Sequence, residues 1–123
     1  MEVRNVDKIK PYITKDKSEI REIFHPTNFV IKNMSIAEAR VKPRETTEYH
    51  FHKKSQEVYF ILKGSGIMEM EGENKEVKVN DCIFIPVGYR HRIKNIGKKT
   101  LRILCQSSPA YSHEDTVLVE QST

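Results

Sequence analysis

The stretch from residue 29 to residue 108 is divided into short segments rich in strand-forming residues, each closed by glycine, proline or an Asn-Asp pair. Alternation of apolar and polar residues, as where Val77 and Val79 flank Lys78, is typical of strands with one buried face. Many short strands with almost no helical pattern predict an all-β sandwich or closed barrel, because closure or pairing of sheets protects strand edges. The expected strands are residues 29–41, 50–64, 66–72, 75–81, 82–88, 91–97 and 100–108.

The length of 123 residues fits one compact domain. We expect a single domain over residues 1–123, in which an N-terminal segment (1–28) and a C-terminal tail (109–123) flank the barrel. Within the N-terminal segment, residues 18–25 have the capping residue and apolar spacing of at most a short helix or turn.

The composition excludes several classes of partner. Basic and acidic side chains are interleaved despite the net charge of +4, so we expect no nucleic acid partner, although an anionic small molecule fits. No apolar run approaches the ~18 residues of a membrane span, and the charged N-terminus lacks the apolar core of a secretory signal. We therefore expect no membrane association and a cytoplasmic location. Cys82 and Cys105 each lie in an apolar run, which predicts buried, reduced thiols.

A group of histidine and carboxylate residues is the strongest candidate site. His50 and His52 are two residues apart in an expected strand, so their imidazoles point to the same side. A short bend over residues 53–56 would return Glu57 to that side, and His91 follows a turn further along the chain. Imidazole and carboxylate ligands suit divalent transition metals. A lone histidine on a strand is more often a surface or core residue, and we interpret His25 and His113 in that way.

Two stretches of this sequence resemble the conserved motifs of the cupin superfamily. Residues 50–64, HFHKKSQEVYFILKG, resemble the first motif, His-x-His, four residues, Glu, six residues, Gly. Residues 80–95 resemble the second, Gly, five residues, Pro-x-Gly, two residues, His, three residues, Asn, with Asn80 where the family usually has glycine. Asparagine also adopts a left-handed conformation, so the turn survives. The matching residues are His50, His52, Glu57, Gly64, Pro86, Gly88, His91 and Asn95.

This resemblance implies a double-stranded β-helix, or jelly-roll, barrel with a metal in its mouth. The implied ligands are His50, His52, Glu57 and His91, holding one divalent ion per chain, which could be Mn, Fe, Co, Ni or Zn. Such a ligand set leaves coordination positions open for a small-molecule substrate. The resemblance also implies a homodimer.

Further polar residues fall near the expected barrel interior. Alternation from Glu57 places Tyr59 and Ile61 in the lumen, where Tyr59 either binds substrate or packs as core. On the strand before the first motif, Glu38 and Arg40 share one face. They bind substrate if that face is the lumen, but we favour contact with solvent or a partner, because charges in a lumen need pairing.

The C-terminal tail is dense in functional groups for a terminus. It resembles the C-terminus of small cupins described as mannose-6-phosphate-isomerase-like, and it either covers a site or caps the barrel. The residues concerned are Tyr111, His113, Glu114 and Asp115.

Three functions fit these residues. The first is a metal-dependent enzyme on a small polar substrate, with isomerisation or epimerisation of a sugar or sugar phosphate as the leading reaction. The second is an Fe- or Mn-dependent dioxygenase. The third is a non-enzymatic module that binds a metal or small ligand. A polar lumen favours the first, and an apolar lumen favours the second; the residues expected to form an apolar lumen are Tyr59, Ile61, Phe84 and Ile93.

Overall fold

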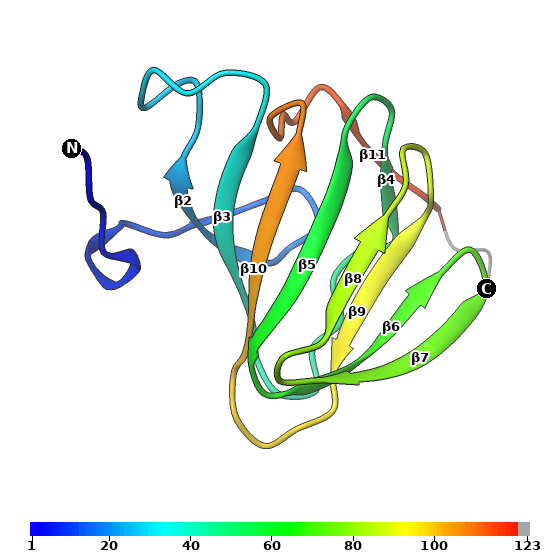
Figure 1. Cartoon of the computed structure of the whole chain (residues 1–123). Helices are drawn as coiled ribbons and strands as arrows, with labels where there is room; N and C mark the ends of the chain where they lie inside the picture. The colour runs from blue at the N-terminus through cyan, green and yellow to red at the C-terminus, as the bar shows by residue number, and fades with distance from the viewer. Residues whose placement is uncertain (121–123) are drawn as a thin grey trace.

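The computed structural model of the chain describes residues 1–120, which form two antiparallel sheets that face each other (Figure 1). One sheet has the order β1 (Tyr12–Ile13), β2 (Glu19–Phe24), β3 (Ser35–Val41), β10 (Leu101–Ser108), β5 (Gln56–Lys63) and β8 (Cys82–Ile85). The other has the order β11 (Thr116–Leu118), β4 (His50–His52), β9 (His91–Asn95), β6 (Ser65–Met70) and β7 (Glu73–Lys78). The predicted all-β jelly-roll barrel is confirmed.

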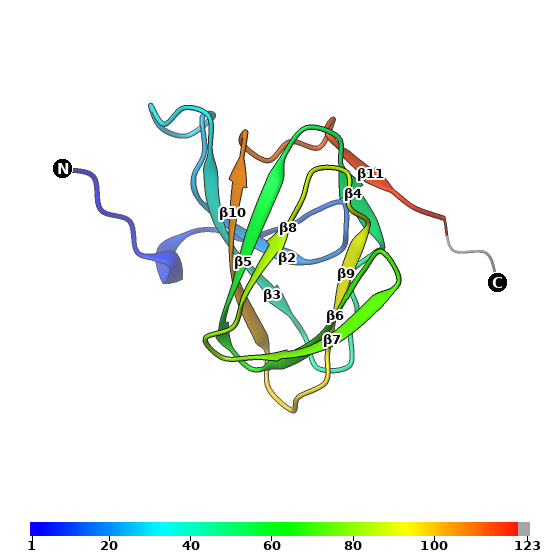
Figure 2. The same cartoon turned by 45° about the vertical axis from the view of Figure 1, so that its right-hand side comes forward.

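The two sheets curve around a common axis, as Figure 2 shows, and their inner faces form the hydrophobic core. Alternate residues of β10 and β5 point inward, as the two-residue period of a strand requires. The most deeply buried apolar side chains come from both sheets. They are Ile61, Ile85, Ile93, Leu101 and Ile103. Part of this core also lines the pocket that holds the predicted site, because Ile93 and Ile103 face the same space as His50 and His52.

Helical structure is confined, within the described range, to the single turn η1 (Val6–Lys8), and nothing in that range is a helix long and apolar enough to cross a membrane. The division into a barrel with flanking segments 1–28 and 109–123 stays a prediction, and residues 121–123 of that tail lie outside the described residues.

The turns that distinguish the two motifs adopt the expected backbone conformations. Asn80, the departure from the usual glycine, has φ 77°, and its amide donates to the carbonyl oxygen of Ile61. Gly64 has φ 90°, and a side chain there would meet the backbone of Leu101 at 3.2 Å. The left-handed turn predicted for Asn80 is therefore present.

The N-terminal segment differs from the sequence prediction. Residues 18–25 do not form a helix or turn; they contain β2, which pairs with β3 from Glu19 opposite Arg40 to Phe24 opposite Ile36. A register shift between Glu22 and Phe24 lets the strand accommodate the apolar spacing that resembled a helical turn. Pairing with β3 overrides the local pattern, so this segment extends the sheet and reaches the mouth of the barrel.

The edge strand β8 also differs from expectation. Cys105 is buried as predicted, but Cys82 is exposed, and both thiols are free. Phe84 is 56% exposed and so does not line the lumen. Both residues point outward because they pair with Phe60 and Val58, which occupy the outer face of β5.

The homodimer implied by the resemblance stays a prediction.

Glu38 and Arg40 lie on the outer face of β3, away from the lumen, as favoured above. Glu38 is nevertheless only 1% exposed, because two arginines cover it. The Arg40 guanidinium donates from Nε to Glu38 Oε1 at 2.5 Å, and that of Arg102 donates from Nε to Oε2 at 3.0 Å. This is a buried structural ion cluster and not the exposed pair that the alternation suggested.

We predict that Glu38→Ala lowers the free energy of unfolding by about 3 kcal/mol, because it leaves two arginines adjacent without their shared counter-charge. The matched control is Glu2→Ala, which removes an exposed partner of Arg4 and should cost less than about 1 kcal/mol. Urea unfolding monitored by circular dichroism measures both losses. Equal, small losses would contradict the structural role of Glu38.

Candidate metal centre

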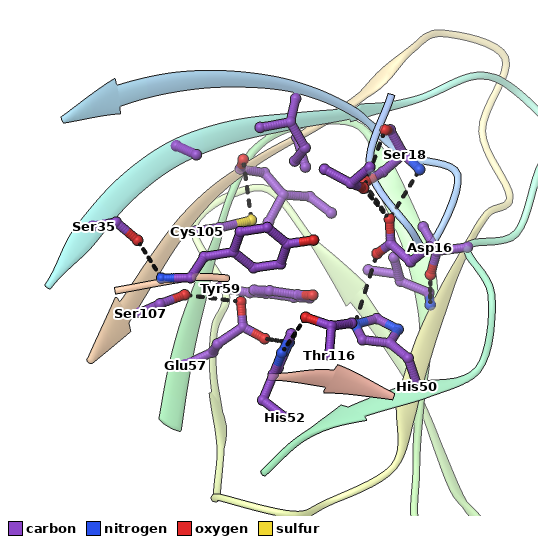
Figure 3. A pocket seen from close by; sticks show the side chains of 18 of the residues that line it. Asp16, Ser18, Ser35, His50, His52, Glu57, Tyr59, Cys105, Ser107 and Thr116 are labelled. Carbon is purple, nitrogen blue, oxygen red and sulfur yellow. Dashed lines mark hydrogen bonds and ion pairs between the residues drawn. The ribbon is translucent and has the colours of Figure 1, made fainter. Parts of the chain in front are cut away.

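The four residues of the predicted site meet at one point in the barrel. Atoms able to ligate a metal on His50, His52, Glu57 and His91 all lie within 4.8 Å of one another, and all four residues are buried. They come from β4, β5 and β9, and His50 is paired directly with His91 across the sheet. Figure 3 shows His50, His52 and Glu57 facing the same pocket.

Local structure explains how residues separated in sequence converge. In β4 both histidines point inward while Phe51 points outward, as the strand period predicts. The bend after β4 is held by the C-terminal segment, because the backbone amide of Ser55 donates to Asp115 Oδ2 at 3.1 Å. The bend returns Glu57 to the histidine side, and Gly88 donates its amide to the carbonyl oxygen of His52 at 2.9 Å.

Backbone carbonyl groups fix the ring orientation of two histidines. The Nδ1 atom of His50 lies 2.7 Å from the carbonyl oxygen of Glu48, and that of His91 lies 2.9 Å from the carbonyl oxygen of Tyr89. A carbonyl oxygen only accepts, so each Nδ1 carries the proton and each Nε2 presents a lone pair to the pocket. This is the tautomer that a metal ligand requires.

The third histidine is oriented by a side chain. His52 Nδ1 lies 3.1 Å from Thr116 Oγ1, and the Thr116 hydroxyl donates its own proton to the carbonyl oxygen of Ser112 at 2.9 Å. The Thr116 oxygen therefore accepts from Nδ1, which again leaves Nε2 toward the pocket. Thr116 lies in β11, opposite His52, and was absent from the sequence prediction.

The meeting point of these groups is electrostatically incomplete without a cation. Glu57 Oε1 lies 2.7 Å from His52 Nε2 and 3.5 Å from His91 Nε2. Both Glu57 Oε1 and His91 Nε2 are buried without a hydrogen-bond partner among residues 1–120. With the protons on Nδ1, the Nε2 lone pairs of His52 and His91 face the Glu57 carboxylate at these distances. A divalent ion bound between the three groups would accept all of these lone pairs. The residues present fit a metal.

The protein environment shifts the pKa values of three of these four groups. Burial, and then the nearby His91, lower the pKa of His50 to about 4, so it is neutral at neutral pH. Burial alone would raise the pKa of Glu57, but contacts with His52 and His91 hold it well below its usual range. Burial alone would lower the pKa of His52, but Glu57 raises it, which favours the protonated form that a metal would deprotonate on binding. The shifts of His50 and Glu57, in contrast, favour the neutral imidazole and the ionised carboxylate that bind metals.

The pocket beside this cluster has a lining of mixed character. Apolar side chains line it together with buried hydroxyl and carboxylate groups. The apolar residues are Ile20, Ala37, Ala39, Val41, Ile93, Ile103 and Cys105. Tyr59 lines the pocket as predicted and is 7% exposed, whereas its role in binding substrate stays a prediction.

The C-terminal residues divide between the site and its support. Tyr111 lines the pocket with its ring 5.9 Å from that of His52, and its hydroxyl lies 3.3 Å from His113 Nδ1 at the rim. Asp115 holds the bend before Glu57, and Glu114 is exposed. Of the two expected roles of the tail, covering a site or capping the barrel, part of the tail therefore has the first. His25 contacts the backbone of Tyr111 and lies outside the metal cluster.

Sequence reasoning missed two carboxylates at the pocket. Asp16, in the turn between β1 and β2, places Oδ2 3.8 Å from His50 Nε2, and Glu22 of β2 lines the same pocket. Burial raises the pKa of Glu22 above its usual value. Only the pairing of β2 with β3 brings these residues to the site, and no local pattern separates them from the many surface acids.

Comparison with known proteins identifies the family. Residues 37–107 match the family described as Cupin domain, and the chain belongs to it. An uncharacterized protein of Methanocaldococcus jannaschii is 51% identical over 114 residues, covering 93% of this chain and 91% of that protein. A mannose-1-phosphate guanylyltransferase of Salmonella montevideo is 28% identical over 120 residues, covering 92% of this chain and 25% of the transferase. The polyketide cyclase RemF from Streptomyces resistomycificus shares the fold, with TM-score 0.83, 22% identity and coverage of 99% and 87%.

We predict that His52→Ala and His91→Ala each abolish stoichiometric metal binding, because each removes one imidazole lone pair from a buried four-residue cluster. Elemental analysis of the purified proteins measures the metal, and circular dichroism checks that the β-rich fold persists. His113→Ala, at the rim, is the control and should retain metal. Full metal content in both ligand variants would overturn the assignment.

We predict that Thr116→Val weakens metal affinity about 10- to 100-fold, because it removes the acceptor that orients His52. Competition with a chromophoric chelator measures the affinity. Thr46→Val, at an exposed threonine, is the matched control and should leave affinity unchanged. Equal affinity in both variants would show that Thr116 does not orient the ligand.

Proposed function

We propose that the protein is a metal-dependent enzyme acting on a small polar substrate, with isomerisation or epimerisation of a sugar or sugar phosphate as the leading reaction. The observation that carries this proposal is the position of four buried ligand groups beside a pocket whose lining includes hydroxyl and carboxylate groups. The similarity to a mannose-1-phosphate guanylyltransferase supports a sugar-type substrate.

The ligand set supports catalysis over a purely structural metal. Three imidazoles and one carboxylate, from His50, His52, His91 and Glu57, would leave positions free on a six-coordinate ion, whereas structural sites are usually closed. A bound Mn, Fe, Co, Ni or Zn ion would supply Lewis acidity toward a carbonyl or hydroxyl oxygen of the substrate.

Two tyrosines would orient a substrate at this centre. Burial raises the pKa of Tyr59 well above its usual value and that of Tyr111 to about 12, so both phenols stay protonated at neutral pH and can donate hydrogen bonds. Both lie against the metal cluster, since the Tyr59 ring is 5.9 Å from the His91 ring. The apolar part of the lining would exclude bulk water from the reacting atoms.

A second candidate is an Fe- or Mn-dependent dioxygenase. The apolar side chains of the lining, which include Ile20, Ile93 and Ile103, favour it because they would accept an apolar substrate or dioxygen. The third alternative, a non-enzymatic binding module, uses the same ligands without chemistry.

Incubation of metal-loaded protein with a panel of aldoses and ketoses in deuterium oxide separates these functions. We expect metal-dependent incorporation of deuterium at the carbon next to the carbonyl, detected by NMR, and its loss after chelation and in His91→Ala. Oxygen consumption without deuterium incorporation would favour the dioxygenase. Ligand binding with neither reaction would contradict an enzymatic role and favour the binding module.

A further inference from the structure

Asp16 is held in one orientation at the mouth of the pocket. Its Oδ1 atom accepts three hydrogen bonds: from Thr14 Oγ1 at 2.6 Å, from Ser18 Oγ at 2.6 Å and from the Ser18 amide at 3.0 Å. Both hydroxyl-bearing residues are buried. Its Oδ2 atom accepts no hydrogen bond from residues 1–120 and faces His50 Nε2 at 3.8 Å. Figure 3 shows Asp16 above His50, across the pocket from Glu57.

The turn that carries Asp16 is anchored to both sides of the metal cluster. The Glu48 amide, two residues before His50, donates to the Asp16 carbonyl oxygen at 2.8 Å. On the other side, Lys15 Nζ donates to the carbonyl oxygen of Thr116 at 2.8 Å. The free oxygen of Asp16 therefore has a defined place beside the proposed metal, although Asp16 is not part of the four-residue cluster.

Other unpartnered groups point to a ligand in the same pocket. Tyr59 is 7% exposed and lines the pocket, and no group of the described chain hydrogen-bonds its hydroxyl. Glu22 receives a hydrogen bond from the Tyr12 hydroxyl on Oε2 at 2.8 Å, but its Oε1 is buried and has no partner among the described residues. The pocket thus offers both unpartnered acceptors and an unpartnered phenol donor.

The charge of the lining selects the kind of ligand. Three carboxylates, those of Asp16, Glu22 and Glu57, line the pocket, and no lysine or arginine is present among its described lining residues. Even with a divalent ion bound, an anionic group would have no side-chain cation to pair with. Phosphate and carboxylate recognition normally uses such cations, with arginine the preferred partner.

We propose that Asp16 positions the substrate: its free oxygen accepts a hydrogen bond from a hydroxyl or amino group of an uncharged or cationic polyol or amino alcohol bound beside the metal. This inference rests on the proposed function and narrows it, because it favours an unphosphorylated substrate over a sugar phosphate. Glu22 supplies a second acceptor further from the metal.

Cobalt-loaded protein tests the inference through its visible absorption. The probes are 2-amino-1,3-propanediol, a cationic amino alcohol, and inorganic phosphate. In the wild-type protein we expect the amino alcohol to perturb the cobalt bands. Asp16→Asn, which keeps the acceptor for Thr14 and Ser18, should weaken that binding about 10-fold or more and leave phosphate binding unchanged or tighter. Glu22→Gln should also weaken binding of the amino alcohol, and it leaves the turn that carries Asp16 intact.

The control is Asp7→Asn, the same change at an exposed aspartate, which should leave both affinities unaltered. Unchanged affinity for the amino alcohol in Asp16→Asn, or an equal loss for both probes, would overturn the role of Asp16. Absence of cobalt bands before any probe is added would instead contradict the proposed metal-dependent function, so the two failures are distinguishable.

Discussion

The hydrogen bonds on the Nδ1 atoms of three histidines determine what this barrel can bind. Carbonyl oxygens of Glu48 and Tyr89, and the hydroxyl of Thr116, fix the rings so that each Nε2 is turned to the same site, two of them beside the Glu57 carboxylate. In a buried site, lone pairs facing a carboxylate are unfavourable unless a cation joins them. The strand pairings, the bend before Glu57 and the turn before His91 all serve to bring these atoms together.

Much of this site could be predicted from sequence, because its information is local. The offsets of His50, His52 and Glu57 and the turn before His91 depend on strand period and on residues with special backbone preferences. The same alternation correctly placed Tyr59 in the lumen, and the need of a buried charge for pairing correctly favoured the outer face for Glu38. It could not show that Arg40 and Arg102 bury Glu38, because that depends on which strands are neighbours.

The errors have the same origin. Residues 18–25 contain β2 because β3 offers an edge for pairing, and a register shift accommodates their helix-like apolar spacing in the strand. Cys82 and Phe84 were expected inside because their segment is apolar, but β8 is an edge strand with an open outer face. Asp16 could not be found because its importance arises only when β1 and β2 fold against the barrel. Sheet order is long-range information that one sequence does not reveal.

The bond between Lys15 and Thr116 has a consequence for how the protein folds. It joins residues 101 positions apart, so the pocket is closed by one of the longest-range contacts in the chain. Contacts of this kind carry the loop-closure entropy of nearly the whole polypeptide and form late in folding. The C-terminal segment adds no residue to the buried apolar core and the N-terminal segment adds Ile20, whereas the pocket is lined by residues of both segments. Ligand binding would therefore stabilise the two ends of the chain against local opening before it changed the stability of the core.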